Sequence, residues 1–246
     1  MMKSLSDLHV KIFADGADKM GMLEMYANPL IKGFTTNPTL MRKAGITDFE
    51  AFSRDMLAHI PDRPIAIEVF ADDFDEMERQ ALRIAQWGAN VYVKIPVTNT
   101  KGEHSAPLIA RLSDNGVKLN VTALMTLDQT REIRDALKNG PSAYISIFAG
   151  RIADTGRDPI PVMAEAVGML QPYPHLELIW ASPREILNIF HAEQIGCHII
   201  TVTNDILAKL HLVGKDLDEY SLETVSMFFS DAQKMGFTIA EEPLPA

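Results

Sequence analysis

The sequence predicts a (β/α)₈ barrel, and three observations lead to that prediction. Eight short β-rich runs alternate with stretches of helical periodicity, and successive runs start 21 to 33 residues apart. Strands that alternate with helices pair in parallel through right-handed crossovers. Eight such units fill about 210 of the 246 residues, which is a usual size for an α/β barrel. The predicted strands are His9–Ala14, Gly33–Thr36, Pro64–Phe70, Asn90–Ile95, Lys118–Leu124, Ala143–Phe148, Leu176–Ala181 and Cys197–Val202.

Helices are predicted between these strands. Asp72–Trp87 carries its apolar residues at helical spacing. Thr126–Lys138 begins with Thr126 and has Gln129 three residues later, which is the spacing of a capping box. Further helices are predicted over Ser182–Glu193, Asp205–Leu212 and Leu222–Met235.

A doubly wound open sheet is the alternative fold. Such a sheet usually has fewer strands and a Gly-rich first turn, whereas the first predicted turn reads Asp15-Gly16-Ala17-Asp18. We therefore assign residues 1–246 to one barrel domain, with 215–246 as a C-terminal helix or arm. This helix is either the last one of the barrel or a segment that packs on a neighbouring subunit.

Composition and charge restrict the class of function. The net charge of −10 argues against a basic groove for nucleic acid. Cys197 is the single cysteine, so no intrachain disulfide framework is possible. No apolar run approaches the roughly 18–20 residues of a membrane span, and the N-terminus does not resemble a signal peptide. We expect a cytoplasmic protein that binds neither nucleic acid nor membrane.

Polar residues gather at the C-terminal ends of the predicted strands, where barrel enzymes carry their chemistry. The predicted strands bring ionisable or amide groups to this one rim. That convergence is more informative than any single residue. The rim residues are Asp15, Thr35–Thr39, Glu68, Lys94, Asn120, Thr122, Ser146, Arg151, Ser182, Arg184, Thr203 and Asn204.

Lys94 is the most informative of these residues. Side chains alternate along a strand, so Val93 and Ile95 would face the helices while Lys94 faces the barrel axis. Burial lowers the pKa of an amine and frees the lone pair that attacks a carbonyl. The alternative is a structural lysine paired with Glu68 on the adjacent strand. The sequence favours neither reading over the other.

Two carboxylates flank this lysine in the predicted barrel. Asp15 and Glu68 would suit general acid–base chemistry, one of them through a water held by Thr122. Taken alone, Asp15 more often caps the following helix, and Glu68 could merely neutralise the lysine. Asn37 precedes Pro38, so turn formation is favoured over a role in holding a substrate hydroxyl.

Two arginines follow strands six and seven. Arg151 and Arg184 offer forked donors for phosphate oxygens, and barrel enzymes often bind phosphate near strands seven and eight. The alternative is a pair of surface arginines in salt bridges. The seven histidines show no ligand spacing, so we expect no metal site.

Six segments resemble the transaldolase family, in the family's order, over roughly residues 11–210. The resemblance implies a cofactor-free class I enzyme that forms a Schiff base on Lys94. It implies Asp15 as the general acid/base at the C4 hydroxyl, with Glu68 and Thr122 holding the catalytic water. The segments are Phe13–Asp15, Gly33–Thr39, Val93–Pro96, Asn120–Thr122, Ser146–Ile152 and Ala181–Arg184.

The resemblance also indicates where a substrate would lie. Asn37, Asn120 and Ser146 would orient a three-carbon unit, and a set of later residues would hold the phosphate. The predicted substrate-binding residues are Thr36, Asn37, Asn120, Ser146, Phe148, Arg151, Ser182 and Arg184, of which the last three would hold the phosphate.

Two activities occur in the family. Transaldolases pass a dihydroxyacetone unit between sugar phosphates, whereas fructose-6-phosphate aldolases release it. This chain has Glu68 and Phe148 where the aldolases typically carry Gln and Tyr, although its length is nearer to the short aldolase-like branch. It departs from the family at Pro183, where Phe is more typical. The strand-eight region Val202–Asp205 also lacks the family's usual Pro or Lys pattern.

We therefore predict a transaldolase-like enzyme of carbohydrate metabolism, in the pentose phosphate pathway, that transfers dihydroxyacetone from a ketose phosphate to an aldose phosphate. The alternatives are cleavage that releases dihydroxyacetone, and a noncatalytic barrel that binds a sugar phosphate. We expect a homo-oligomer whose partners are small-molecule sugar phosphates.

Overall fold

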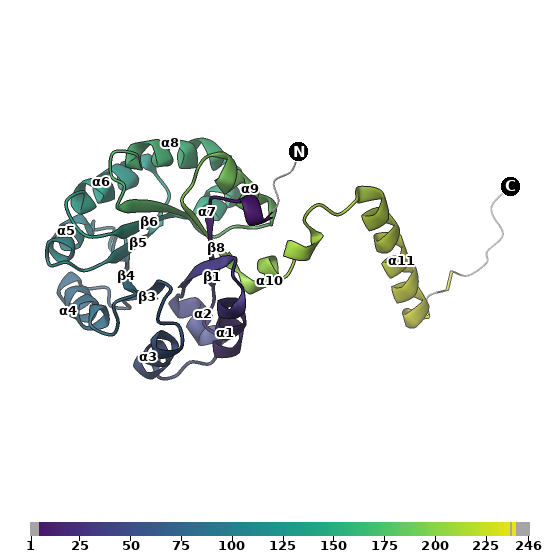
Figure 1. Ribbon diagram of the computed structural model, residues 1–246, viewed down its shortest axis with the longest axis horizontal. Coiled ribbons are helices and arrows are strands. Elements are labelled where there is room, and N and C mark those ends of the chain that lie inside the picture. Colours follow the sequence, from purple (N-terminus) through teal and green to yellow (C-terminus); the bar gives the residue numbers. More distant parts are fainter. Residues whose placement is uncertain (1–4, 237, 240–246) are drawn as a thin grey trace. The chain divides into compact units, whose positions relative to one another are not determined.

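A computed structural model describes residues 5–236, 238 and 239 of the chain. Within these residues, eight parallel strands follow one another in sequence order, and β8 closes the barrel on β1. The arrangement confirms the (β/α)₈ barrel and excludes the open sheet (Figure 1). The strands are β1 (Lys11–Asp15), β2 (Ile31–Thr35), β3 (Ile65–Glu68), β4 (Val91–Pro96), β5 (Leu119–Leu124), β6 (Ala143–Ile147), β7 (Leu176–Trp180) and β8 (Ile199–Thr203).

Helices surround the strands on the outside of the barrel (Figure 1). None of the described helices is long and apolar enough to pass through a membrane. The barrel helices are α1 (Lys19–Ala27), α2 (Pro38–Lys43), α3 (Phe49–His59), α4 (Phe74–Ala85), α5 (Ala106–Asp114), α6 (Leu127–Leu137), α7 (Ala149–Asp154), α8 (Ile160–Leu170), α9 (Leu187–Gln194) and α10 (Asn204–Leu207).

The capping box predicted at Thr126 is present at the start of α6, with Gln129 as the reciprocal partner. The helix predicted over Ser182–Glu193 begins only at Leu187. Ser182 adopts a left-handed backbone with φ of 61°, and the following Pro183 disfavours helical geometry in the residue before it. These two residues form a loop at the end of β7 instead.

The chain divides into two compact units between Ala208 and Lys209. The second unit contains a 3₁₀ turn, Leu210–Leu212, and the helix α11, Leu217–Met235. The helix predicted over Asp205–Leu212 is broken, because α10 ends at Leu207 before the 3₁₀ turn begins.

An aromatic layer fills the barrel interior below the C-terminal ends of the strands. Tyr92 stacks on Tyr144 with ring centroids 4.0 Å apart, and Phe13 meets Tyr144 edge to face. Gly33 is needed beside this layer, since a Cβ there would lie 2.5 Å from the Phe13 ring. The next inward positions along β1 and β4 are Asp15 and Lys94. The packed rings thus form a floor beneath the polar residues.

The predicted alternation along β4 is confirmed. Val93 and Ile95 are completely buried on the helix side of the sheet, while Lys94 borders a cavity on the inner side. Both the apolar contacts outside and the aromatic floor inside restrict this strand to one register.

Gly150 in α7 fits tightly against the loop that follows β7. A Cβ at this position would lie 1.6 Å from the carbonyl oxygen of Ser182, which is backbone and cannot move as a side-chain tip would. We expect Gly150→Ala to lower the free energy of unfolding by about 1–3 kcal/mol or more through overpacking. Thermal unfolding measures this change.

Gly168→Ala in α8 is the matched control, because nothing lies within 4 Å of the Cβ it would add. Alanine favours a helix over glycine, so this variant should unfold at the wild-type temperature or slightly above it. Equal melting temperatures for the two variants would contradict the close approach at Gly150.

Candidate active site

A cavity of about 680 Å³ opens at the C-terminal ends of the strands. Each of the eight strands, or the loop directly after it, contributes to the lining. The predicted convergence of polar groups at one rim is therefore present. The polar and charged lining residues are Asp15, Thr35, Asn37, Thr39, Glu68, Lys94, Asn120, Thr122, Ser146, Arg151, Ser182, Arg184, Thr201, Thr203 and Asp205.

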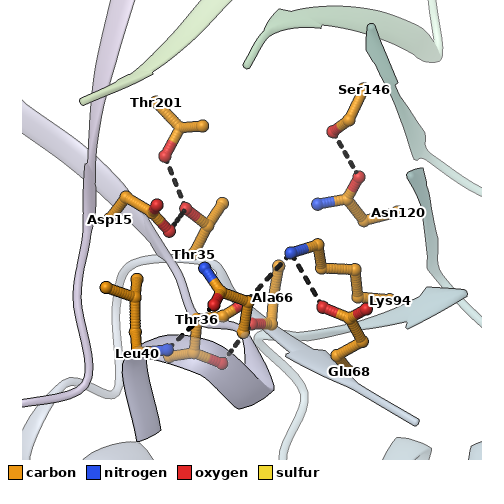
Figure 2. Close-up of polar contacts among 11 residues, drawn as sticks. Asp15, Thr35, Thr36, Leu40, Ala66, Glu68, Lys94, Asn120, Ser146 and Thr201 are labelled. Atoms are coloured by element: carbon orange, nitrogen blue, oxygen red, sulfur yellow. Dashed lines mark hydrogen bonds and ion pairs between the residues drawn. The ribbon is translucent and has the colours of Figure 1, made fainter. Parts of the chain in front are cut away.

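Lys94 lies at the base of this cavity and is only 7% exposed. Its Nζ donates to the carbonyl oxygen of Thr36 at 3.0 Å and forms an ion pair with Glu68 Oε2 at 2.9 Å (Figure 2). The pair follows from the strand register, which places Glu68 of β3 directly opposite Lys94 of β4. The ion pair expected for a structural lysine thus exists, and the same amine borders the cavity.

Asp15 ends β1 and accepts a hydrogen bond from Thr35 Oγ1 at 2.7 Å (Figure 2). Burial raises the pKa of this carboxyl, and the charge of Lys94 and the bond from Thr35 oppose that rise. The prediction that Asp15 caps the first helix is wrong. Asp18 caps α1 by accepting from the Gly21 amide, because the helix starts only after the Gly16–Ala17 turn.

Two buried polar atoms on β5 have no hydrogen-bond partner among the described residues. Ser146 Oγ donates to the side-chain oxygen of Asn120, Oδ1, at 2.7 Å. The nitrogen of the same side-chain amide has no hydrogen-bond partner. The hydroxyl of Thr122 is in the same situation. Unpaired buried donors cost free energy and are rare in protein interiors. Their position beside the cavity is typical of groups that meet a ligand or an ordered water.

The backbone is strained at two positions around the cavity. Ala123 and Ser182 are the non-glycine residues with positive φ in the described part of the chain, at 66° and 61°. Both line the cavity. Ala123 lies where the register of β5 against β6 shifts, directly after Thr122. Backbone strain of this kind clusters at functional sites, where the surrounding fold maintains it.

The segment after β2 serves two purposes. Asn37 Oδ1 accepts from the Leu40 amide at 2.9 Å and caps α2, which confirms the predicted turn chemistry, and the residue also lines the cavity. Thr36 is not among the lining residues. Its hydroxyl donates to the carbonyl of Ala66, and its own carbonyl receives Lys94 (Figure 2).

The two arginines differ in their contacts. Arg184 donates from Nε to Asp154 Oδ1 at 2.9 Å, from Nη2 to Oδ2, and from Nη1 to Ser182 Oγ at 3.0 Å. The salt bridge considered as an alternative for Arg184 is therefore present. The guanidinium of Arg151 lies 5.9 Å from the centre of the Phe148 ring. Both cations line the cavity, as does that ring.

Sequence reasoning missed three residues of this site: Thr201, Asp154 and Asp205. Thr201 could have been found from the period-two pattern of β8, because it precedes Thr203 by two residues. Asp154 pairs with an arginine 30 positions away, and no local signal predicts that contact. Asp205 lies in the segment noted for its departure from the family pattern.

A metal site would need several ligating side chains close together. Among the described residues, no group of three or more His, Cys, Asp or Glu side chains is placed to hold a metal ion. The expectation that the site uses no metal or cofactor stays a prediction.

Fold and cavity define a (β/α)₈ barrel protein with a charged site at the C-terminal face, where a buried amine lies beside a carboxylate. The sequence model described as Transaldolase/Fructose-6-phosphate aldolase matches residues 12–241. The chain belongs to this family.

Curated relatives agree with this assignment. The chain is 33% identical to a "Probable transaldolase" of Dehalococcoides mccartyi, over 82% of this chain and 90% of that protein. It is 32% identical to a "Probable transaldolase" of Thermoanaerobacter sp., over 94% of this chain and all of that protein. A third protein with that name, from Streptococcus equi subsp. equi, is 35% identical over 82% and 90% of the two chains.

Solved structures share the fold at low sequence identity. A 3-keto-L-gulonate-6-phosphate decarboxylase of Vibrio cholerae has a TM-score of 0.53 and 12% identity, over 83% of this chain and 95% of that one. A 2,3-dimethylmalate lyase has a TM-score of 0.52 and 12% identity, over 98% and 89%. These likenesses concern the barrel alone.

Proposed function

We propose that the protein transfers a dihydroxyacetone unit from a ketose phosphate to an aldose phosphate through a Schiff base on Lys94. Family membership makes the chain an enzyme of the aldolase/transferase type. The observation that supports the finer proposal is the placement of Lys94. Among the described residues that line the cavity it is the one lysine, and Glu68 lies 2.9 Å from its Nζ.

In this mechanism the ammonium of Lys94 first gives a proton to Glu68. The free amine attacks the ketone carbon, and loss of water leaves a protonated imine. Asp15 then takes the proton of the C4 hydroxyl while the C3–C4 bond breaks, and the electron pair moves into the imine to form an enamine. The aldehyde fragment leaves. The imine acts as the electron sink, and covalent attachment divides one difficult step into several easier ones.

The second half of the reaction reverses these steps with a different aldehyde. The enamine attacks the acceptor carbonyl, Asp15 returns the proton to the new hydroxyl, and water hydrolyses the imine. Burial raises the pKa of Asp15, and a rise in this direction favours a carboxyl that has to donate a proton as well as accept one. We assign the hydrolytic water to Glu68 and to the unpaired hydroxyl of Thr122.

Substrate positioning is assigned to the remaining lining residues. The unpaired amide of Asn120 would donate to a substrate oxygen, with Ser146 holding that amide in place and Asn37 reaching the same three-carbon unit. We assign the substrate phosphate to Arg151, Ser182 and Arg184. Arg184 forms an ion pair with Asp154, so a bound phosphate would compete with that carboxylate for it.

Transfer is favoured over cleavage by two positions. Phe148 offers no proton at the place where the related aldolases typically carry tyrosine, and Glu68 stands where they carry glutamine. Hydrolysis of the lysine-bound enamine requires protonation at carbon. A site with few proton donors would preserve the enamine until an acceptor arrives. The proposed setting is cytoplasmic carbohydrate metabolism in the pentose phosphate pathway, without nucleic acid as a partner.

We further propose that α11 packs in a homo-oligomer. Leu222, Val225 and Phe229 lie on one stripe of this helix and are 67%, 60% and 66% exposed. Apolar surface of this extent usually marks an interaction site. The chain has a net charge of −10, so an anionic lipid surface would repel it. A protein partner therefore suits this apolar stripe better.

Trapping tests the role of Lys94. Borohydride reduction with fructose 6-phosphate should attach the donor to Lys94, and Lys94→Met should fold normally without forming the adduct, since methionine keeps the length but has no amine. Mass spectrometry of peptides locates the adduct. Wild-type protein without acceptor should release little dihydroxyacetone.

Four results would reject parts of this proposal. An adduct on another lysine, or wild-type turnover by Lys94→Met, would remove Lys94 from the mechanism, and no adduct at all would favour a noncatalytic barrel. Release of dihydroxyacetone as fast as transfer would replace transaldolase activity by aldolase activity. Lys118→Met is a control, because that amine bonds the Ala89 carbonyl, and Lys118 does not line the cavity.

Arg184→Ala is expected to raise KM for phosphorylated donors about ten- to a hundredfold, the worth of one charge-assisted contact. KM for dihydroxyacetone as donor should change little. Asp154→Asn should have the opposite effect on phosphorylated donors, because it removes the carboxylate that competes for Arg184. Steady-state kinetics with both donors measures the contrast, and equal effects on both would make Arg184 structural.

Light scattering tests the assignment of α11. The full chain should have a mass that is a multiple of 27.3 kDa. Val225→Asp combined with Phe229→Asp should shift it towards the single-chain mass, whereas Thr224→Asp should not, because Thr224 lies on another side of the helix from the apolar stripe. A wild-type mass of one chain would refute the proposal.

A further inference from the structure

Asp15 is held by two threonines from the strands on either side of it. Thr35 comes from β2 and Thr201 from β8, and both strands pair with β1 because the barrel is closed. Thr35 is 2% exposed and Thr201 is 7% exposed. Their hydroxyl oxygens contact each other, and Thr35 also contacts Asp15 Oδ1 (Figure 2).

The protons of this chain can be assigned from its partners. Each hydroxyl has one proton, and Thr35 donates its proton to Asp15 Oδ1. In the described part of the protein, Thr35 is the one hydrogen-bond partner of the Thr201 hydroxyl. Thr201 must therefore donate to Thr35. The reverse direction would require a second proton on the Thr35 hydroxyl.

We propose that Thr201 is a positioning residue for the acid–base chemistry of Asp15. Through Thr35 it fixes Oδ1 as a permanent hydrogen-bond acceptor, so Oδ2 is the oxygen that exchanges a proton with the substrate. In this role the threonines do not transfer protons. They hold Oδ1 of Asp15 in place and thereby orient Oδ2 towards the substrate. The inference rests on the proposed function for the identity of Asp15 as the acid–base group.

The surroundings of Asp15 define the expected effect of losing this anchor. Lys94 from β4 and Glu68 from β3 are the charged groups that act on its carboxyl. Farther out, the cavity carries Arg151, Arg184 and Asp205. The hydrogen bond from Thr35 stabilises the carboxylate against burial. Because hydrogen-bonded groups polarise one another, loss of the Thr201 hydroxyl weakens this bond and raises the pKa of Asp15.

Thr201→Val tests the proposal, since it keeps the shape and removes the hydroxyl. NMR titration of ¹³C-labelled aspartate, assigned with Asp15→Asn, measures the carboxyl pKa without substrate. It should rise by about half to one unit, and the acid limb of kcat/KM, which also reports the free enzyme, should move upward equally. Thr201→Ser keeps the hydroxyl, so both the carboxyl pKa and the acid limb should have their wild-type values. Thr201→Ala is a second deletion of the hydroxyl and should shift both values in the same direction.

Thr130→Val is the matched control. Thr130 is also buried, and its hydroxyl makes one hydrogen bond, to the Thr126 carbonyl in α6. It should leave the pKa of Asp15 and the pH profile unchanged. An unchanged pKa in both Thr201→Val and Thr201→Ala, or an equal shift in Thr130→Val, would overturn the proposal. The titration needs no turnover, so a shifted pKa without Schiff-base trapping would instead reject the proposed function.

Discussion

The ion pair between Lys94 and Glu68 is the interaction on which the arrangement of the site depends. A charged amine is costly to bury, and a partner at 2.9 Å on the neighbouring strand reduces that cost. The pair is possible because the register of β3 against β4 places the two residues opposite each other. A slip of β4 by one residue would turn Lys94 to the helix side of the barrel and away from Glu68, so the apolar packing outside the sheet also maintains the site.

The aromatic layer beneath this ion pair determines how far the polar cavity extends into the barrel. The rings of Phe13, Tyr92 and Tyr144 pack against one another inside the barrel. Gly33 has no side chain, and this leaves room for the ring of Phe13. The polar groups of the cavity therefore lie above the rings. The two unpaired donors, on Asn120 and Thr122, lie in this upper layer, where a ligand can reach them.

The barrel and the inward direction of Lys94 could be predicted from the periodicity of the sequence. The other features of the site depend on contacts between residues that are distant in the chain. The spacing of strands predicted the barrel, and alternation predicted that Lys94 points inward. For Asp15 taken alone, a local rule favours helix capping, whereas the closed barrel supplies Thr35 as its partner and Asp18 caps the helix. The positive φ of Ala123 has no signature in the sequence, because glycine is the residue that usually marks such a position.

The two strained residues connect the stability of the barrel to the shape of the site. Each left-handed conformation costs on the order of 1–3 kcal/mol and persists only where its surroundings hold it. Ser182 is held by the close approach of Gly150 to its carbonyl and by the hydrogen bond that its side chain receives from Arg184. The same bond orients a cation at the cavity. Relaxing the backbone at Ser182 would thus displace the guanidinium, so the barrel maintains the strain and the position of this cation together.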